Sequence, residues 1–373
     1  MFYCVHPEKS PQAYFSSRLL VLRSSMKVHS ELCLAASDKG LCLGSFPGGG
    51  NWMKMANETG LEGLISLQAP QPFSLSETIG YLSRSANECL FHVESGRVYR
   101  LIEVGGERVM AEISGHDTTV NIRCHSDNPL TSSVRAAVAG HVWEWFDFDR
   151  DLSPFYEQME YCSGMKEVAR AYYGLRIVGV VDLFEALCWA IMGQQINLTF
   201  AYSLKRRFVE SFGGHQEWAG RNYWLFPRPE AIAQLHVDDL LSLQFTRRKA
   251  EYVLDVARRM AEGSLSKHSL LQTGDFQAAK RELIKIRGIG PWTANYVLMR
   301  CLRDPSAFPV EDVGLQNAVK ATWGMDRKPS IEELREMAVA WAGWEAYATF
   351  YLWRSLYHFV ADSARRGFDS SDR

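Results

Sequence analysis

The sequence predicts an α+β protein in which the β-structure comes first and the second half is helical. Two observations predict this class. Short segments rich in Val, Ile, Tyr and Phe follow one another between residues 88 and 123, with glycine-containing turns between them. From about residue 128 onward, apolar residues recur at helical spacing. The chain, at 373 residues, is long enough for two or three domains.

The β-rich part is predicted as an antiparallel meander with one helix. The expected strands are Glu88–Val93, Arg97–Val104, Arg108–Ile113 and Thr118–Arg123, with turns at Ser95-Gly96, Gly105-Gly106 and Gly115-His116-Asp117. Connections this short join neighbouring antiparallel strands. The segment Ser74–Leu82 has helical spacing, so the sheet is expected to carry a helix on one face.

The rest of the chain is predicted as a series of helices. They are expected at residues 130–147, 182–192, 198–212, 229–243, 247–262, 278–286, 291–302, 314–323, 331–340 and 345–362. The breaks come at Gly213-Gly214, Pro227, Gly288-Ile289-Gly290, Pro305 and Pro329, all of which contain residues that interrupt helices. We therefore expect a poorly defined N-terminal segment (1–60, with a hairpin at Leu32–Leu43), a sheet domain (61–150) and a helical domain (151–373).

Composition excludes several classes of protein. No apolar run can span a bilayer, and Leu19–Leu22 is too short for the core of a signal peptide, so we expect a cytoplasmic protein with no membrane partner. The eight cysteines form no C-x-x-C pair, which argues against a zinc site or a dense disulfide framework. The net charge of -2 does not favour nucleic acid, but basic runs at 247–259 and 280–287 could form local patches. Solvated helix faces are the alternative for both runs.

A short turn between two helices is the most informative motif. Gly288 can take a positive φ and end the first helix, Gly290 allows close approach of another backbone, and Pro291 suits the first turn of the next helix. Amides at such a turn point outward together and form an anion site, for which a DNA phosphate is the natural partner. A plain helix corner is the alternative for the glycines alone.

The full string LIKIRGIGPWTANY (283–296) resembles the helix-hairpin-helix of the DNA glycosylase superfamily, with the hairpin at 283–302. Further segments resemble the AlkA-type branch, the 3-methyladenine DNA glycosylases II: Gly174–Ile177, Val181–Glu185, Gly193–Ile196, Phe226–Pro229 and Pro309–Leu315. The resemblance is strong over about 170–360 and general over about 70–130. It implies a TATA-binding-protein-like sheet domain before helical glycosylase domains. It also implies a base excision repair enzyme that acts on double-stranded DNA, which we expect to be a monomer.

The resemblance also assigns roles to individual residues. Asp312 matches the catalytic aspartate, with helix capping as the alternative. The residues that match the aromatic base pocket are Trp292, Tyr296 and Trp344, with core packing as the alternative. The residues expected to contact DNA are Gly288, Ile289, Gly290 and Thr293, together with Gln195, which falls where related enzymes insert a wedge into the gap left by the flipped base.

One carboxylate suffices for this chemistry. An N3- or N7-alkylated purine already carries positive charge, so no general acid need protonate it. A fixed anion stabilises the oxocarbenium character of the sugar and can orient or deprotonate the attacking water. The lesion base must first leave the stack, and a cationic ring over an aromatic face gains roughly 0.5–2 kcal/mol. Glycosidases with poor leaving groups need a second carboxylate as acid.

A lysine and a set of cysteines that some relatives carry are absent here, which narrows the expected reaction and cofactors. Trp292 stands where bifunctional glycosylase-lyases of the superfamily carry a lysine, so we expect a monofunctional enzyme that leaves an intact abasic site. No cysteine follows Cys301, which excludes the C-terminal iron–sulfur cluster of the endonuclease III and MutY-type branches. No cofactor is expected to be required. The family implies a sodium or potassium ion held by backbone carbonyls, here those of Ile284, Ile286 and Ile289.

Two other functions are compatible with these residues. The first keeps the fold and changes the substrate to deaminated or oxidised bases. The second is a non-catalytic protein that binds DNA lesions. Base release and the effect of replacing Asp312 with asparagine separate the three.

Overall fold

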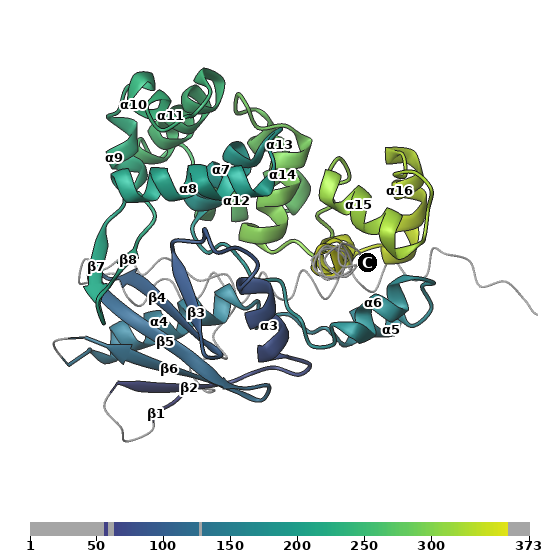
Figure 1. The fold of residues 1–373 in the computed structure, drawn as a ribbon, viewed down its shortest axis with the longest axis horizontal. Coiled ribbons are helices and arrows are strands. Elements are labelled where there is room, and N and C mark those ends of the chain that lie inside the picture. Colours follow the sequence, from purple (N-terminus) through teal and green to yellow (C-terminus); the bar gives the residue numbers. More distant parts are fainter. Residues whose placement is uncertain (1–55, 59–62, 127–128, 357–373) are drawn as a thin grey trace, which may run out of the picture. The chain divides into compact units, whose positions relative to one another are not determined.

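The computed structural model describes residues 56–58, 63–126 and 129–356. The chain divides into two units, Met1–Asn51 and Trp52–Arg373, and the described residues all belong to the second. The first unit, with the hairpin expected at Leu32–Leu43, lies outside the described residues. The second contains a β-sheet followed by helices (Figure 1). The predicted α+β class is therefore confirmed, whereas the division at residue 150 stays a prediction because one hydrophobic core runs through sheet and helices.

The sheet is antiparallel and six-stranded, in the order β1-β2-β6-β5-β4-β3. Its strands are β1 (Ala56–Glu58), β2 (Leu64–Gln68), β3 (Phe91–Glu94), β4 (Arg97–Val104), β5 (Glu107–His116) and β6 (Thr119–His125). Tight turns set the register, because Gly105 and Gly106 both take positive φ (60° and 83°) between β4 and β5. The predicted meander is present, and β1 and β2 were not predicted.

The first expected strand begins later than its composition suggests. Glu88 does not pair in the sheet, because its carboxylate accepts hydrogen bonds from the amides of Cys89 and Leu90, both at 2.9 Å. The same carboxylate binds the ammonium of Lys205. A side chain that takes up backbone amides in this way competes with strand pairing.

Both faces of the sheet are covered. Helices α3 (Leu75–Leu82) and α4 (Ser132–Trp145) accompany the sheet, and Val98 and Ile102 of β4 belong to the main core. Leu101 points to the other face because side chains alternate along a strand. There it packs with Met110 and Tyr223. Tyr223 belongs to an unpredicted hairpin, β7 (His215–Trp218) and β8 (Arg221–Trp224), which reaches down beside the sheet in Figure 1.

The remaining chain is helical. Its elements are α5 (Ser153–Met159), α6 (Met165–Ala171), α7 (Leu183–Gly193), α8 (Leu198–Phe212), α9 (Pro229–Ala233), α10 (Val237–Leu241), α11 (Arg247–Ala261), α12 (Lys267–Leu271), α13 (Phe276–Ile284), α14 (Pro291–Val297), the π-helix η1 (Leu298–Leu302), α15 (Val313–Thr322), α16 (Ile331–Ala338), the 3-10 helix η2 (Val339–Trp341) and a helix at 345–356. None of the described helices is long and apolar enough to cross a membrane.

Two predicted helices are divided. The segment 229–243 forms α9 and α10 because His236 starts a second helix, with its amide donating to Asp239 Oδ2 at 2.7 Å. The segment 291–302 is α-helical only as far as Val297 and then widens into η1. Helices α5, α6 and α12 were not predicted, because they are too short to show a periodic pattern.

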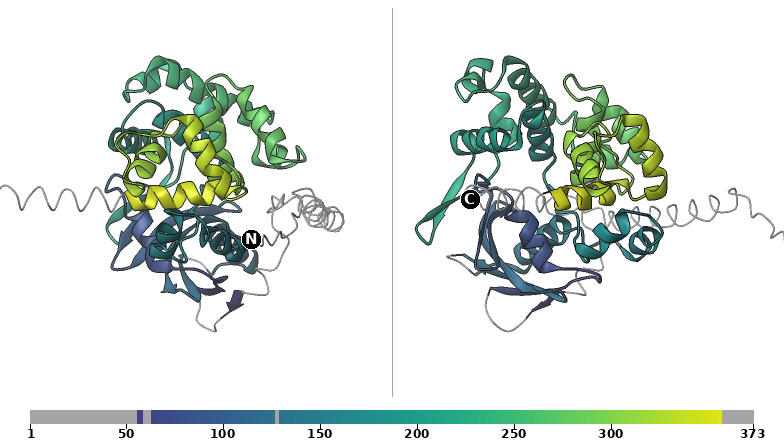
Figure 2. Two further views of the ribbon diagram at one scale, coloured as in Figure 1. Left: turned by 90° about the vertical axis from the view of Figure 1, so that its right-hand side faces the viewer. Right: turned by 45° about the vertical axis from the view of Figure 1, so that its right-hand side comes forward.

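Helices α5 and α6 lie beside the C-terminal helices (Figures 1 and 2). The Tyr156 hydroxyl of α5 lies 2.6 Å from the Tyr351 hydroxyl, and Gln158 donates to the Ala340 carbonyl at 2.9 Å. These contacts join segments that are far apart in the sequence. The contact between Tyr156 and Tyr351 holds the helix at 345–356, which contributes to the site described below.

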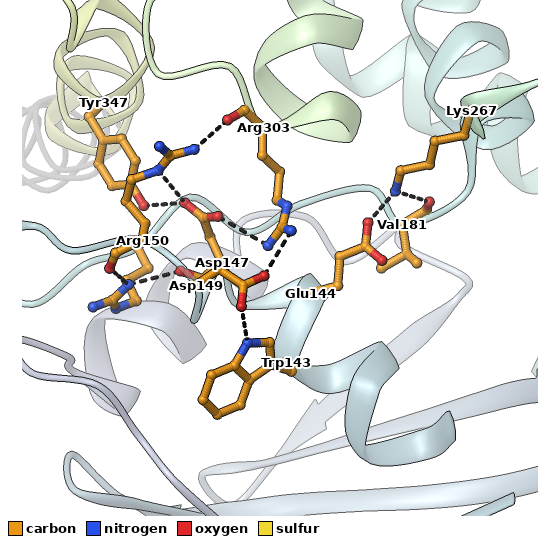
Figure 3. A network of polar contacts seen from close by, with 10 residues as sticks. Trp143, Glu144, Asp147, Asp149, Arg150, Val181, Lys267, Arg303 and Tyr347 are labelled. Carbon is orange, nitrogen blue, oxygen red and sulfur yellow. Dashed lines mark hydrogen bonds and ion pairs between the residues drawn. The ribbon is translucent and has the colours of Figure 1, made fainter. Parts of the chain in front are cut away.

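A polar network joins the end of α4 to the end of η1 and to the same C-terminal helix (Figure 3). Arg303 has a φ of 60° and donates to Asp147 at 3.3 Å and to Asp149 at 2.9 Å. Tyr347 donates to Asp147 at 2.6 Å. These contacts tie the C-terminal end of η1 to neighbouring elements. Within η1, Arg300 Nε donates to the Val178 carbonyl at 2.8 Å, which holds the Arg300 side chain in place.

Arg176 is a buried cation that ties together two loops. Its guanidinium is fully buried and donates to backbone carbonyls on two sides, those of Pro70 and Pro72 before α3 and those of Asp147 and Arg150 after α4. We expect Arg176→Met to lower the free energy of unfolding by about 3–5 kcal/mol, because it leaves buried carbonyls without donors. Urea unfolding measures the change.

The matched control for this substitution is Arg170→Met. Arg170 makes an exposed ion pair with Glu160 at 2.8 Å, and such pairs contribute about 0–1 kcal/mol. An equal loss of stability in both variants would contradict a structural role for the buried guanidinium of Arg176.

Candidate active site

The turn between α13 and α14 has the geometry expected of the hairpin. Gly288 has a φ of 88°, and a Cβ built on it would lie 2.3 Å from the ring of Tyr252. Both the conformation and the space therefore require glycine at this position. Gly290 has a φ of -88°, which any residue adopts, and a Cβ there would meet nothing within 4 Å. The backbone at Gly290 is thus open to an approaching group.

Two residues of the turn expected to contact DNA face inward instead. Ile289 is 3% exposed, and its amide donates to the Ile286 carbonyl at 3.0 Å. Thr293 is 1% exposed, and its hydroxyl accepts a hydrogen bond from Gln194 at 3.0 Å. The two side chains hold the hairpin in shape, so only backbone groups at the start of α14 remain for a phosphate.

Gln194 and Gln195 follow α7 and do different things. The Gln194 amide donates to the Gly288 carbonyl at 2.9 Å and to Thr293, so it fastens this loop to the hairpin. Gln195 is exposed and has a φ of 55°. The neighbouring Leu198 is 43% exposed. The expected wedge position is therefore on the surface, next to an apolar side chain.

Asp312 lies on the wall of a cavity of about 260 Å³ next to the hairpin. The cavity is lined by Tyr81, Arg84, Trp189, Gly193, Ile196, Leu198, Ala201, Trp292, Tyr296, Arg300, Asp312, Gly314 and Trp353. Most of these side chains are aromatic or apolar, with few charged groups, as in typical ligand pockets. Asp312 is the one carboxylate among the lining residues that the structure describes.

Three N–H groups hold the carboxylate of Asp312. Oδ1 accepts from the Leu315 amide at 2.7 Å and from Trp353 Nε1 at 2.9 Å, and Oδ2 accepts from Trp292 Nε1 at 3.0 Å. Asp312 is therefore the N-cap of α15 and a cavity residue at once, so the two interpretations of the sequence do not compete. A carboxylate has about four acceptor positions. One on Oδ2 is left for water or substrate.

Close approach at this carboxylate depends on Gly314. A Cβ on Gly314 would lie 2.9 Å from Asp312 Oδ1 and 3.4 Å from Trp353 Nε1. A side chain there would push the aspartate and the indole apart. Glycine at this position therefore permits the hydrogen bond between Asp312 and Trp353.

The predicted aromatic residues divide into two groups. The rings of Trp292 and Tyr296 stack with centroids 5.7 Å apart and both line the cavity. Trp344 does not line it and packs on Phe155 and Tyr347 instead. Trp353 lines the cavity instead. Trp344 directly precedes the helix at 345–356, whereas Trp353 lies within that helix, near its end.

Burial affects the ionisable groups next to the cavity. It raises the pKa of the Tyr296 phenol, although the cation of Arg300 opposes the shift, so this hydroxyl is neutral at physiological pH. Arg300 is 4% exposed and donates to the hydroxyls of Tyr81 and Tyr296. The guanidinium of Arg84 lies 4.0 Å from the centroid of the Tyr81 ring.

Five residues that line the cavity were not predicted from the sequence: Trp353, Gly314, Arg300, Arg84 and Trp189. Arg300 lies four residues after Tyr296, so helical spacing alone could have placed it near the same face. Trp353 lies 41 residues after Asp312, and nothing in the local pattern distinguishes it from the other tryptophan of its segment.

The basic runs are largely occupied by contacts within the protein. Lys285 pairs with Glu282 at 2.7 Å and Arg287 with Glu251 at 3.1 Å. Lys249 is buried and donates to the Met192 carbonyl at 2.7 Å. Pairs at the surface open at little cost, so Lys285 and Arg287 stay available to a phosphate, whereas Lys249 does not.

Cation binding at the hairpin would have to use backbone oxygens. Among the described residues no group of three or more His, Cys, Asp or Glu side chains could hold a metal. The Ile286 carbonyl accepts from the Ile289 amide, and a carbonyl oxygen has a second lone pair. The carbonyls of Ile284, Ile286 and Ile289 therefore remain chemically suitable for a hard monovalent cation.

Two protein families match successive parts of the chain. The N-terminal domain of 8-oxoguanine DNA glycosylase matches residues 73–187, and the HhH-GPD superfamily of base excision DNA repair proteins matches residues 188–342. The chain is 46% identical to a DNA-3-methyladenine glycosylase of Bacillus subtilis, over 79% of this chain and 97% of that protein.

Solved structures share the fold. A 3-methyladenine DNA glycosylase from Archaeoglobus fulgidus matches with a TM-score of 0.69 at 24% identity, over 79% of this chain and 98% of that one. An 8-oxoguanine glycosylase/lyase of Clostridium acetobutylicum matches with a TM-score of 0.62 at 19% identity, over 80% and 98%. The chain therefore belongs to the helix-hairpin-helix superfamily of base excision repair glycosylases, and within it to the DNA-3-methyladenine glycosylases.

Proposed function

We propose that this enzyme removes alkylated purines of the 3-methyladenine and 7-methylguanine type from double-stranded DNA by hydrolysis, as a monomer. The observation that carries the proposal is the single carboxylate, Asp312, fixed by two indole N–H groups on the wall of an aromatic cavity. The name of the Bacillus subtilis relative supports the same substrate class.

One carboxylate matches a substrate whose base leaves easily. The lesion base turns out of the stack and enters the cavity. As the N-glycosyl bond breaks, the bonding electrons go to the cationic base, which becomes neutral. The anion of Asp312 stabilises the positive charge that develops on the sugar. Water then adds to the sugar carbon and gives up a proton, for which Oδ2 of Asp312 has a free acceptor position.

The hairpin and the loop after α7 would hold the DNA. Backbone amides at the start of α14, beside Gly290, bind a phosphate without reading sequence. Gln195, exposed on its loop, fills the gap left by the flipped base. A sodium or potassium ion on the carbonyls of Ile284, Ile286 and Ile289 would stiffen the turn. No other cofactor is part of the proposal.

Oxidised bases are the second candidate substrate. The family that matches residues 73–187 and the structural neighbour from Clostridium acetobutylicum are both named for 8-oxoguanine. Trp292 favours a hydrolytic enzyme over a lyase, because an indole cannot form a Schiff base with the sugar.

The test measures which bases the enzyme releases and how. The full-length protein is incubated with DNA carrying labelled methyl groups, and separately with duplexes containing hypoxanthine or 8-oxoguanine. Parallel reactions contain borohydride, which traps a Schiff base as a covalent adduct. We expect release of 3-methyladenine and 7-methylguanine, intact abasic sites and no covalent protein–DNA adduct. Preferential release of 8-oxoguanine, or a trapped adduct, would overturn the proposal. No release of any base would favour a non-catalytic lesion-binding protein.

A further inference from the structure

Arg300 is a buried cation shared by two phenols of the cavity. Its Nη1 donates to the Tyr81 hydroxyl at 2.9 Å and to the Tyr296 hydroxyl at 3.2 Å, while Nε donates to the Val178 carbonyl at 2.8 Å. Nη1 carries two hydrogens, and each phenol oxygen receives one. Both phenols line the cavity that holds Asp312.

This arrangement fixes the direction in which the hydroxyls can donate. A guanidinium donates hydrogen bonds and accepts none. Each phenol oxygen accepts from Arg300, so its own hydrogen must be donated to another group. Among the described residues, the hydrogen bonds found at both hydroxyls are those from Arg300, and neither hydroxyl is found donating to a protein group. A base that enters the cavity would supply the missing acceptor.

The other hydrogen-bond donors and the charges of the cavity do not distinguish a keto from an amino group on the base. The indole N–H groups of Trp292 and Trp353 are both used by Asp312. Arg84 and Arg300 place positive charge next to the cavity. Like charges repel in a medium of low dielectric constant. The carboxylate of Asp312 places negative charge in the same cavity. These charges act on every cationic base alike, so they do not separate one alkylated purine from another, whereas hydrogen bonding does.

We propose that Arg300, acting through Tyr81 and Tyr296, makes the pocket select purine lesions that carry a keto oxygen at ring position 6 over lesions that carry an amino group there. The proposal rests on the proposed glycosylase function and names the substrate class of the same site. A keto oxygen accepts the phenol hydrogen. An amino group at that place leaves a buried hydroxyl unpaired, and sites built around one hydrogen-bond pattern reject the opposite pattern.

The release of 7-methylguanine and of 3-methyladenine is compared between wild type and variant. Both bases are cationic in DNA, and they differ at position 6, in the methylated nitrogen and in the 2-amino group of guanine. A variant that lacks one phenol hydroxyl changes none of these differences between the bases, so a change in the ratio of their release reports the hydrogen bond of that hydroxyl. Labelled methylated DNA contains both lesions, and the released bases are separated by chromatography. Each rate is divided by the spontaneous rate of release of the same base.

We expect Tyr296→Phe to lower the ratio of 7-methylguanine to 3-methyladenine release by about tenfold, which is the effect of one hydrogen bond. Tyr81→Phe is expected to shift the ratio in the same direction. Arg300→Met removes the donors that orient both hydroxyls and should also lower the ratio. Tyr161→Phe, at a residue 92% exposed, is the matched control and should keep the wild-type ratio.

The result separates this inference from the proposed function. An unchanged ratio in Tyr296→Phe and Arg300→Met would overturn the inference while the glycosylase activity stands. An equal loss for both bases would also overturn it, because a fold defect or a general positioning role lowers both rates together. Failure of the wild-type protein to release either base would instead contradict the proposed function.

Discussion

Asp312→Asn is expected to lower the single-turnover rate of base release by at least about a thousandfold. The substitution removes the anion that stabilises the positively charged sugar, and the loss of one fixed electrostatic group already costs about 10²–10³ in rate. It also removes one hydrogen bond, because the amide nitrogen that replaces Oδ2 cannot accept from Trp292 Nε1. Asparagine caps helices about as well as aspartate, and its carbonyl oxygen can accept from Leu315 and Trp353 as Oδ1 does now.

Binding should therefore survive where catalysis does not. The affinity of Asp312→Asn for lesion-containing duplex, measured by fluorescence anisotropy, is expected to stay within a few-fold of wild type. Glu311→Gln is the matched control, since it neutralises the neighbouring carboxylate, which does not line the cavity. If Asp312→Asn kept a tenth or more of the wild-type rate, the carboxylate would not be the catalytic group.

Gly288→Ala is expected to lower both stability and DNA affinity. A non-glycine residue at a φ of 88° is strained by about 1–2 kcal/mol, and the methyl group would collide with the ring of Tyr252. Overpacking of this kind costs about 1–3 kcal/mol more. We expect a loss of about 2–5 kcal/mol in the free energy of unfolding and at least a tenfold weaker binding to duplex DNA, because the turn can no longer present its amides.

Gly290→Ala provides the contrast. Its backbone is unstrained and its surroundings are open, so the free energy of unfolding should change by less than about 1 kcal/mol. A loss of DNA affinity in this variant would come from the methyl group in the path of the phosphate. Adding Tyr252→Ala to Gly288→Ala removes the collision and leaves the backbone strain, so the double variant should recover part of the stability. Wild-type stability in Gly288→Ala would contradict the steric argument.

The parts of the fold that the sequence predicted are those with a strong local pattern. The meander from Arg97 to Arg123 has glycine turns and β-branched residues, and most of the longer helices have clear apolar periodicity. The short helices α5, α6 and α12 carry too few residues for a periodic signal. The hairpin β7–β8 was missed because its apolar residues face the sheet through a contact with Leu101 and Met110 that only the tertiary structure creates.

In the candidate site too, the residues that could be predicted are those with a local sequence motif. Trp292, Tyr296 and Asp312 lie in or near a recognisable motif, so their proximity could be predicted. Trp353 lines the cavity and Trp344 does not, and this depends on which side of a distant helix faces the cavity. Arg300 was missed for a different reason. A charged residue in an apolar segment looks like an exposed position, and its burial depends on Tyr81, which lies 219 residues earlier in the chain.

The hydrogen bond from Trp353 to Asp312 means that the site is completed only late in synthesis of the chain. During synthesis domains fold as they emerge, N-terminal parts first. The hairpin and the sheet can form early, but the carboxylate acquires its second indole donor only after residue 353 has left the ribosome and its helix has docked. A chain that ends before residue 353 lacks this donor, so we expect it to break glycosyl bonds less efficiently than the full-length chain.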